Sequence, residues 1–209
     1  MPLFRKTRDR EPSSSGNGAR WIVVGLGNPG REYESTRHNA GAMALDELVE
    51  RVHGTLKRHK SGCLTADTSI ASHSVVLARP MTYMNESGRP VRALMSWYKA
   101  SPEDLIVLHD EMDVPFGEIR IKQGGGTAGH NGLGSIVDHL GSKSFNRVRI
   151  GVGRPRGSDA VRHVLAGFSS TQKKELPQLI SSAADAAERM IEIGVERAMN
   201  EFNTRSTAG

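Results

Sequence analysis

The sequence predicts an α/β fold, a single-domain three-layer sandwich in which a twisted mixed β-sheet is flanked by helices on both faces. Short apolar runs typical of buried strands alternate along the chain with longer segments whose apolar residues recur at helical spacing. The 209 residues are enough to bury a sizeable core, and we find no internal repeat. One domain is therefore expected over residues 21–205.

Residues 1–20 differ in composition from the rest of the chain. They are charged and then rich in serine and glycine, with almost nothing to bury, so we expect a disordered N-terminal tail. The tail has no apolar segment of the kind found in secretory signals, and Asp9 and Glu11 argue against a transit peptide. These features favour a cytoplasmic protein.

Charge and cysteine content narrow the function classes. Lys and Arg number 28 against 23 Asp and Glu, a net charge of +5 that is compatible with a polyanionic partner but does not demonstrate one. The only cysteine, Cys63, excludes an internal disulfide and fits a reducing compartment. No apolar stretch approaches the roughly 20 residues that span a bilayer, so no membrane association is expected.

Strands are expected, in chain order, at residues 21–27, 74–79, 105–109, 118–122 and 147–153. The first three are nearly continuous apolar runs, as in strands buried on both faces. The last two alternate, with Ile119 and Ile121 on one side of the strand and Arg120 and Lys122 on the other.

Helices are expected where apolar residues form one stripe. This spacing occurs at residues 45–52, 91–98 and 133–140, between the expected strands. A longer pattern over residues 180–202 predicts a single closing C-terminal helix.

Four polar loops follow strands or lead into helices. They comprise residues 27–39, 80–88, 109–113 and 124–132. In an open α/β sheet, ligands bind beyond the carboxyl ends of the strands. If the loops converge, they bring together one histidine, one aspartate and three asparagines: His38, Asp110, Asn28, Asn85 and Asn131.

This inventory can be compared with reaction classes. The chain has no G-x-S-x-G elbow and no H-E-x-x-H or paired-cysteine zinc motif. A magnesium cluster of Asp110, Glu111 and Asp113 is disfavoured because neighbouring side chains diverge on an extended chain; we expect Glu111 and Asp113 in a solvated turn. A His–Asp pair among amides remains. It suits direct hydrolysis of an activated ester, with the imidazole taking a proton from water.

Five segments carry a resemblance to a known family. They are GLGNPGREYESTRHNAG (25–41), PMTYMNESG (80–88), HDEMD (109–113), GGGTAGHNGL (124–133) and RVRIGVGRP (147–155). In order and spacing they resemble the bacterial-type peptidyl-tRNA hydrolase family, from about residue 21 to the C-terminal helix. The resemblance implies a cytoplasmic, monomeric enzyme, free of metal and cofactor, that recycles tRNA by cleaving the ester between a peptide, or an N-blocked amino acid, and the 3′ ribose.

The resemblance also implies residue roles. His38 would be the general base, Asp110 the partner that keeps it basic, and Asn28 a sensor of the substrate. Contacts to the 3′ end of peptidyl-tRNA would come from Tyr33, Tyr83, Met84, Asn85 and Asn131. Tyr83 stands where the family more often has Phe, and Thr127-Ala128 replaces a more usual His-Gly. We expect His130 to order its loop rather than to catalyse.

On the acceptor stem, the resemblance implies that Lys122 and Arg149 clamp the 5′ phosphate of the tRNA. Because side chains alternate along a strand, Arg120 shares a face with Lys122, and Arg147 shares one with Arg149. The two neighbouring strands are therefore expected to present a patch of up to four cations.

Two other classes stay open at this point. A non-catalytic RNA-binding relative, like those recruited to intron splicing in plant organelles, could keep the fold and lose activity; the joint presence of His38, Asp110 and the three asparagines argues against it. A nucleotide-dependent α/β enzyme could use the glycine loop on phosphate, and nucleotides would then stabilise it against heat. A hydrolysis assay on an N-blocked aminoacyl-tRNA separates these classes from the esterase.

Overall fold

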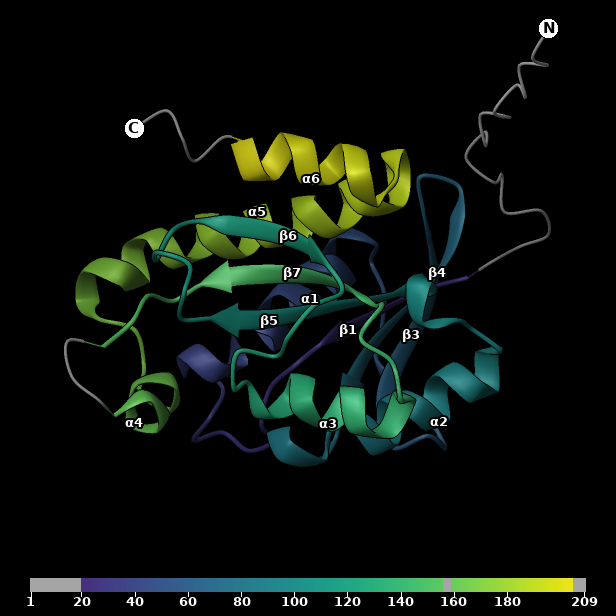
Figure 1. Ribbon diagram of the computed structural model, residues 1–209, viewed down its shortest axis with the longest axis horizontal. Coiled ribbons are helices and arrows are strands. Elements are labelled where there is room, and N and C mark those ends of the chain that lie inside the picture. The colour runs from purple at the N-terminus through teal and green to yellow at the C-terminus, as the bar shows by residue number, and fades with distance from the viewer. Residues whose placement is uncertain (1–19, 156–158, 205–209) are drawn as a thin grey trace, which may run out of the picture.

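The computed structural model describes residues 20–155 and 159–204 (Figure 1). Its sheet has seven strands within this part of the chain, in the order β2-β3-β4-β1-β5-β7-β6. The strands are β1 (Trp21–Gly25), β2 (Lys57–Arg58), β3 (Cys63–Ile70), β4 (His73–Pro80), β5 (Leu105–Glu111), β6 (Ile119–Gln123) and β7 (Asn146–Gly151). The central strands β4, β1, β5 and β7 run parallel, and the strands at both edges are antiparallel. The prediction of a mixed sheet is confirmed.

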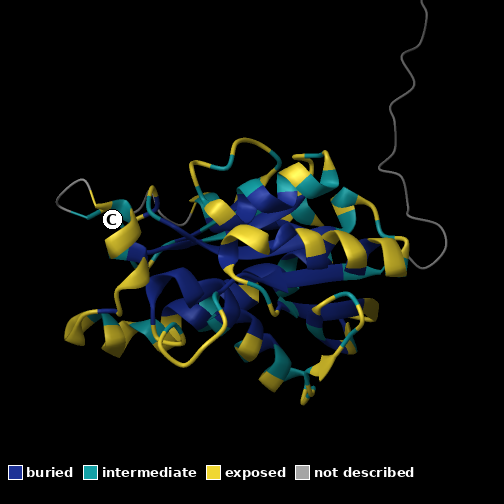
Figure 2. Cartoon of the chain, turned by 90° about the horizontal axis from the view of Figure 1, so that it is seen from below, coloured by how far each residue is buried: buried dark blue, intermediate teal, exposed yellow. Residues whose placement is uncertain are grey.

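Helices cover both faces of the sheet (Figure 1). On one face lie α1 (Ala40–Arg51), α5 (Ser170–Ile193) and α6 (Val195–Thr204), and on the other lie α2 (Gly88–Tyr98) and α3 (Asn131–Leu140). Each helix turns one apolar stripe toward the sheet, and the exposed positions lie on its outer side (Figure 2). The three-layer sandwich is thus as predicted.

The central strand shows why the sheet needs two helical layers. Ile22, Val23 and Val24 are fully buried. Ile22 and Val24 pack with α2 and α3, whereas Val23 packs with α1 and α5. A strand with apolar side chains on both faces is stable only if both faces are covered.

Three parts of the fold differ from the prediction. The hairpin of β2 and β3 was not expected, because the edge strand β3 (CLTADTSI) carries polar residues that weaken its apolar signal. The short helix α4 (Ala160–Leu165) was also missed. The prediction of a single C-terminal helix is wrong. Helix α5 ends at Ile193, because Gly194 after it has a φ of +86°, which is outside the helical region. Helix α6 begins at Val195 and packs against both α5 and β6.

The predicted tail lies outside the described residues except for Arg20, which forms an ion pair with Asp67 on β3. Among the described residues, no helix is both long and apolar enough to cross a membrane.

Candidate active site

The four polar loops meet at the carboxyl ends of the parallel strands, as predicted. Together they line a cavity of about 490 Å³. Of the predicted site residues, seven contribute to its wall: Asn28, His38, Tyr83, Met84, Asn85, Asp110 and Asn131. The convergence follows from topology, because parallel strands end at the same edge of a sheet.

Two glycines bring the start of α1 close enough to build the site. A Cβ on Gly41 would lie 2.1 Å from the Leu108 carbonyl oxygen, and one on Gly25 would lie 2.5 Å from the Leu45 Cβ. Any larger residue would therefore push α1 away from β1 and β5. Because α1 packs this closely, the 3₁₀ turn Arg37–Asn39 that precedes it holds His38 against Asp110 of β5.

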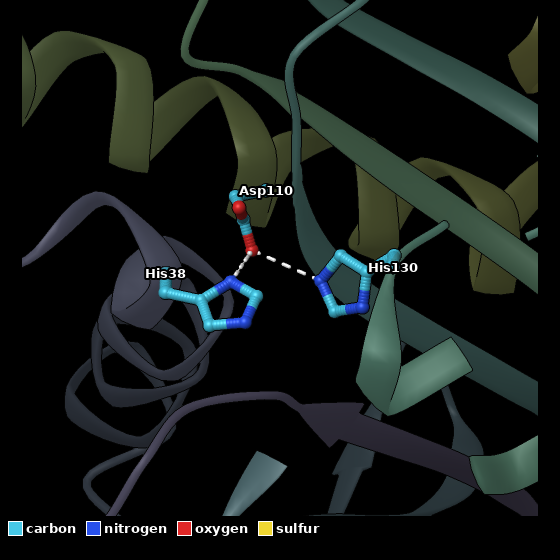
Figure 3. Close-up of side chains that lie close together, drawn as sticks. All are labelled: His38, Asp110 and His130. Carbon is cyan, nitrogen blue, oxygen red and sulfur yellow. Dashed lines mark hydrogen bonds and ion pairs between the residues drawn. The ribbon is translucent and has the colours of Figure 1, made fainter. Parts of the chain in front are cut away.

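The centre of the site is one carboxylate oxygen shared by two histidines (Figure 3). Asp110 Oδ1 lies 2.9 Å from His38 Nδ1 and 3.0 Å from His130 Nε2. A carboxylate only accepts hydrogen bonds, so both of these ring nitrogens carry a proton. In neutral His38 the other nitrogen, Nε2, is then an unprotonated base. No described residue bonds to it, and His38 lines the cavity.

His130 is held differently, because it caps the N-terminus of α3. Its Nδ1 accepts hydrogen bonds from the backbone N–H groups of Gly132 at 3.1 Å and Leu133 at 3.3 Å. This nitrogen must be unprotonated, so His130 is neutral with its proton on Nε2, the nitrogen that donates to Asp110. Both nitrogens of His130 are thus occupied, whereas His38 has one free. The geometry supports the prediction that His130 orders its loop.

The surroundings keep Asp110 ionised. Its burial by itself would raise the pKa of the carboxyl group, but the hydrogen bonds that it accepts from His130 and His38 outweigh burial and hold the pKa well below its usual range. The neighbouring His109 is fully buried, and burial lowers its pKa to about 3, so it is neutral. Its Nδ1 bonds to the Asp110 carbonyl oxygen at 2.7 Å.

Asn28 has its side chain fixed by the next loop. Its Oδ1 accepts from the Met84 backbone N–H at 2.8 Å, which leaves the Asn28 amide NH₂ free to donate. The Asn39 side chain forms two hydrogen bonds to the Asn28 backbone. It accepts from the Asn28 N–H at 2.9 Å and donates to the Asn28 carbonyl oxygen at 3.0 Å. Sequence reasoning missed Asn39, although its position next to His38 in the first motif was a signal.

The remaining cavity residues form a floor and a rim. Met84 is buried and lines the floor, whereas Asn85 and Asn131 are exposed at the mouth. Tyr83 is 55% exposed. Tyr33 stands edge-on to the Tyr83 ring, with centroids 6.4 Å apart, beside the lining of the cavity rather than in it.

An apolar wall from α4 completes the cavity and was not predicted. Val161, Val164 and Leu165 line it, and Val161 is 65% exposed. The residue before the predicted base holds this helix: the buried Arg37 guanidinium donates to the carbonyl oxygens at the end of α4 and just after it, those of His163, Ala166 and Gly167. A six-residue helix gives too little periodicity for sequence patterns to detect.

Lys122 and Arg149 lie together, but outside this cavity. They line a second hollow of about 450 Å³ at the β6–β7 edge of the sheet. Arg149 Nε is 3.1 Å from Glu111 Oε2. The prediction that Glu111 sits in a solvated turn is therefore wrong, because β5 continues through Glu111 and buries it.

Of the expected patch of up to four cations, three line this hollow: Arg120, Lys122 and Arg149. Arg147 does not belong to it. Arg147 is 2% exposed, and its guanidinium bonds to the carbonyl oxygens of Gly125 and Gly126. Arg120 turns across the sheet edge to the Asn203 carbonyl oxygen and Glu118. The shared face was predicted correctly, but one arginine is covered by the glycine loop, which no pattern along the strand indicates.

Among the described residues, His38, Asp110 and His130 form a group that could hold a metal ion, with their ligand atoms within 4.8 Å of one another. In the arrangement present, both ring nitrogens that face Asp110 carry protons, and the other nitrogen of His130 accepts from α3. A metal ion would have to replace these hydrogen bonds.

Comparisons with known proteins agree on one family. The family model described as peptidyl-tRNA hydrolase matches residues 22–208. The peptidyl-tRNA hydrolase of Kineococcus radiotolerans is 51% identical over 191 residues, covering 88% of this chain and 96% of that protein. That of Mycobacterium marinum is 52% identical over 184 residues, covering 87% and 96%. The crystal structure of peptidyl-tRNA hydrolase from Acinetobacter baumannii is 39% identical, with a TM-score of 0.83 and coverage of 88% and 94%.

Proposed function

Because this chain belongs to the peptidyl-tRNA hydrolase family, an enzyme family that hydrolyses peptidyl-tRNA, we propose that His38 is its general base and Asp110 the residue that orients it. One observation carries this assignment. Of the two histidines on Asp110, only His38 has an unprotonated nitrogen left for the cavity, since both nitrogens of His130 are occupied.

In the proposed reaction, a water molecule bonds to His38 Nε2 and attacks the carbonyl carbon of the ester. As the C–O bond forms, the water proton moves to Nε2 and the imidazolium is stabilised by the ionised Asp110. When the tetrahedral intermediate collapses, the bond to the ribose 3′ oxygen breaks and that oxygen takes the proton from His38. The products are a free peptide and tRNA, and His38 is neutral again.

The three asparagines recognise the reacting end of the substrate. The free NH₂ of Asn28 can donate to the carbonyl of the first peptide group, whereas the α-ammonium of an unblocked aminoacyl-tRNA is a donor and would find no acceptor there. Asn85 and Asn131 at the mouth are placed to bond the ester carbonyl and the terminal nucleotide. An amide donor aimed at a developing oxyanion contributes several kcal/mol in other acyl-transfer enzymes, roughly 3–4.

The tRNA itself is recognised at the rim and at the neighbouring hollow. Tyr33 and Tyr83 offer exposed ring faces for the bases of the 3′ end. Lys122 and Arg149 bind the 5′ phosphate, which lies near the 3′ end in an acceptor stem. We further propose that the enzyme works as a cytoplasmic monomer, where ribosomes make its substrate, and that catalysis by the His38–Asp110 pair needs neither a metal ion nor a cofactor.

The test is hydrolysis of N-acetyl-aminoacyl-tRNA by His38→Ala. We expect kcat to fall by about 10²–10⁴, the usual contribution of a general base, with an unchanged circular dichroism spectrum. The matched variant is His130→Ala, which should lose much less activity. The assignment fails if folded His38→Ala keeps near-normal turnover, or if His130→Ala is the more damaging of the two.

A further inference from the structure

Arg147 is a buried arginine whose surroundings are unusual. It lies in the middle of β7, opposite Lys122, and is 2% exposed. No carboxylate among the described residues forms an ion pair with it, and its Nε has no hydrogen-bond partner. Burying a charge that has no ion-pair partner costs free energy. The burial of Arg147 therefore requires an explanation, which its hydrogen bonds suggest.

The Arg147 guanidinium bonds only to the glycine loop. Nη1 lies 2.6 Å from the Gly126 carbonyl oxygen, and Nη2 lies 2.7 Å from that of Gly125. In a planar trans peptide, the N–H points opposite to the C=O. The N–H groups of Gly126 and Thr127 therefore point away from the buried arginine and toward the solvent side, where Gly125 and Gly126 are exposed.

These two N–H groups have no acceptor among the described residues. Lys122 lies beside them: its Nζ is 3.0 Å from the point where a Cβ on Gly125 would sit. Gly125 also has a φ of +92°, so a larger residue is disfavoured twice, by the backbone conformation and by the lysine. Successive free N–H groups next to an ammonium group form a concave site for an anion.

We propose that Arg147 is a positioning residue that turns the amides of Gly126 and Thr127 toward a phosphodiester of the substrate RNA. This inference rests on the proposed function. It adds two backbone N–H donors, oriented by the buried Arg147, to the side chains already assigned to RNA binding. The catalytic pair does not depend on these donors, because His130 is anchored by Asp110 and by the N-terminus of α3. Arg147 is therefore expected to act on substrate binding and to leave the chemical step intact.

The first experiment compares Arg147→Met with Arg51→Met. Both remove an arginine that makes several hydrogen bonds to the chain, but Arg51 joins α1 to α5 and lines neither the cavity nor the Lys122–Arg149 hollow. With full-length N-acetyl-aminoacyl-tRNA, we expect Arg147→Met to raise KM about tenfold or more and to leave kcat nearly unchanged. The variant would lose hydrogen bonds from the loop amides to a charged phosphate, and one such bond is enough for a tenfold change in affinity. Arg51→Met should change KM little.

Arg147→Lys separates geometry from charge. Lysine keeps the charge but lacks the planar fork that bonds two carbonyl oxygens, so we expect KM to stay raised. Full recovery of KM in Arg147→Lys, equal effects of Arg147→Met and Arg51→Met, or a fall in kcat at unchanged KM would each overturn the proposal.

A second measurement uses the wild-type enzyme, so a variant that fails to fold cannot decide the outcome. In ¹H–¹⁵N NMR spectra, an acceptor-stem minihelix RNA should shift the amide signals of Gly126 and Thr127. N-acetyl-aminoacyl-adenosine, which has no phosphate, should shift signals around His38 and leave these two in place. If the wild-type enzyme hydrolyses its substrate but the RNA leaves both amides unmoved, this inference fails and the proposed function stands; absence of hydrolysis would instead refute the proposed function.

Discussion

Replacing Asp110 by asparagine tests how the two histidines divide their work. An asparagine can present either its carbonyl oxygen or its NH₂ group to His38. The NH₂ orientation would force the His38 proton onto Nε2 and abolish the base. His130 prevents this, because its Nε2–H, 3.0 Å from Asp110 Oδ1, must face an acceptor as long as its Nδ1 caps α3. The asparagine oxygen should therefore stay on both rings.

The expected loss follows from this orientation. The bond to His38 Nδ1 is kept but loses its charged acceptor. A hydrogen bond to a charged group contributes about 1.5–3 kcal/mol and a neutral one about 0.5–1.5 kcal/mol, so the change costs about 1–1.5 kcal/mol. That corresponds to about a tenfold lower kcat.

The assay is single-turnover hydrolysis of N-acetyl-aminoacyl-tRNA by Asp110→Asn, alone and combined with other changes. With His130→Ala added, the asparagine is free to flip, and activity should drop toward that of His38→Ala. In the His38→Ala background, Asp110→Asn should cost almost nothing further, because the two residues act as a unit. The reasoning is refuted if the His38→Ala and Asp110→Asn defects multiply, or if Asp110→Asn is equally damaging with and without His130.

Three further predictions concern recognition and the apolar wall. Asn28→Ala and Asn28→Asp should narrow the ratio of rates on N-acetyl-aminoacyl-tRNA and unblocked aminoacyl-tRNA; an unchanged ratio would contradict the role of the Asn28 NH₂ group. Lys122→Ala and Arg149→Ala should each raise KM for the full-length substrate and leave short esters without the 5′ phosphate unaffected. The salt dependence of KM should also become less steep, by roughly 0.7–0.9 in log–log slope for each phosphate that is no longer neutralised. Equal losses on both substrates would mean that the two residues form only a solvated charged face. Arg37→Met should lower the free energy of unfolding by about 2–4 kcal/mol in urea denaturation, because it removes the buried guanidinium that bonds to the carbonyl oxygens of His163, Ala166 and Gly167 and to the Gln172 side chain. A loss under about 0.5 kcal/mol would show that α4 is held by other contacts.

The sequence by itself determined the fold class and the position of the site. Apolar runs and helical stripes are local patterns, and burial on one or both faces produces them directly, so the central strands and the main helices could be predicted from them. Polar residues at strand ends could likewise be placed at one edge of the sheet. His38, Asp110 and Asn28 could therefore be expected near one another at that edge, and all three line the cavity there.

The tertiary structure decided what each of these residues can do. Whether a histidine is a base depends on what occupies its two nitrogens, and the α3 amides that fix His130 are recognisable only once the helix has formed. The polar edge strand β3 and the six-residue α4 gave no periodicity to detect. The alternation of side chains along the strand predicts that Arg147 is exposed like Arg149, yet the glycine loop covers it. Burial of a polar side chain is set by segments distant in sequence, so only the assembled chain determines it.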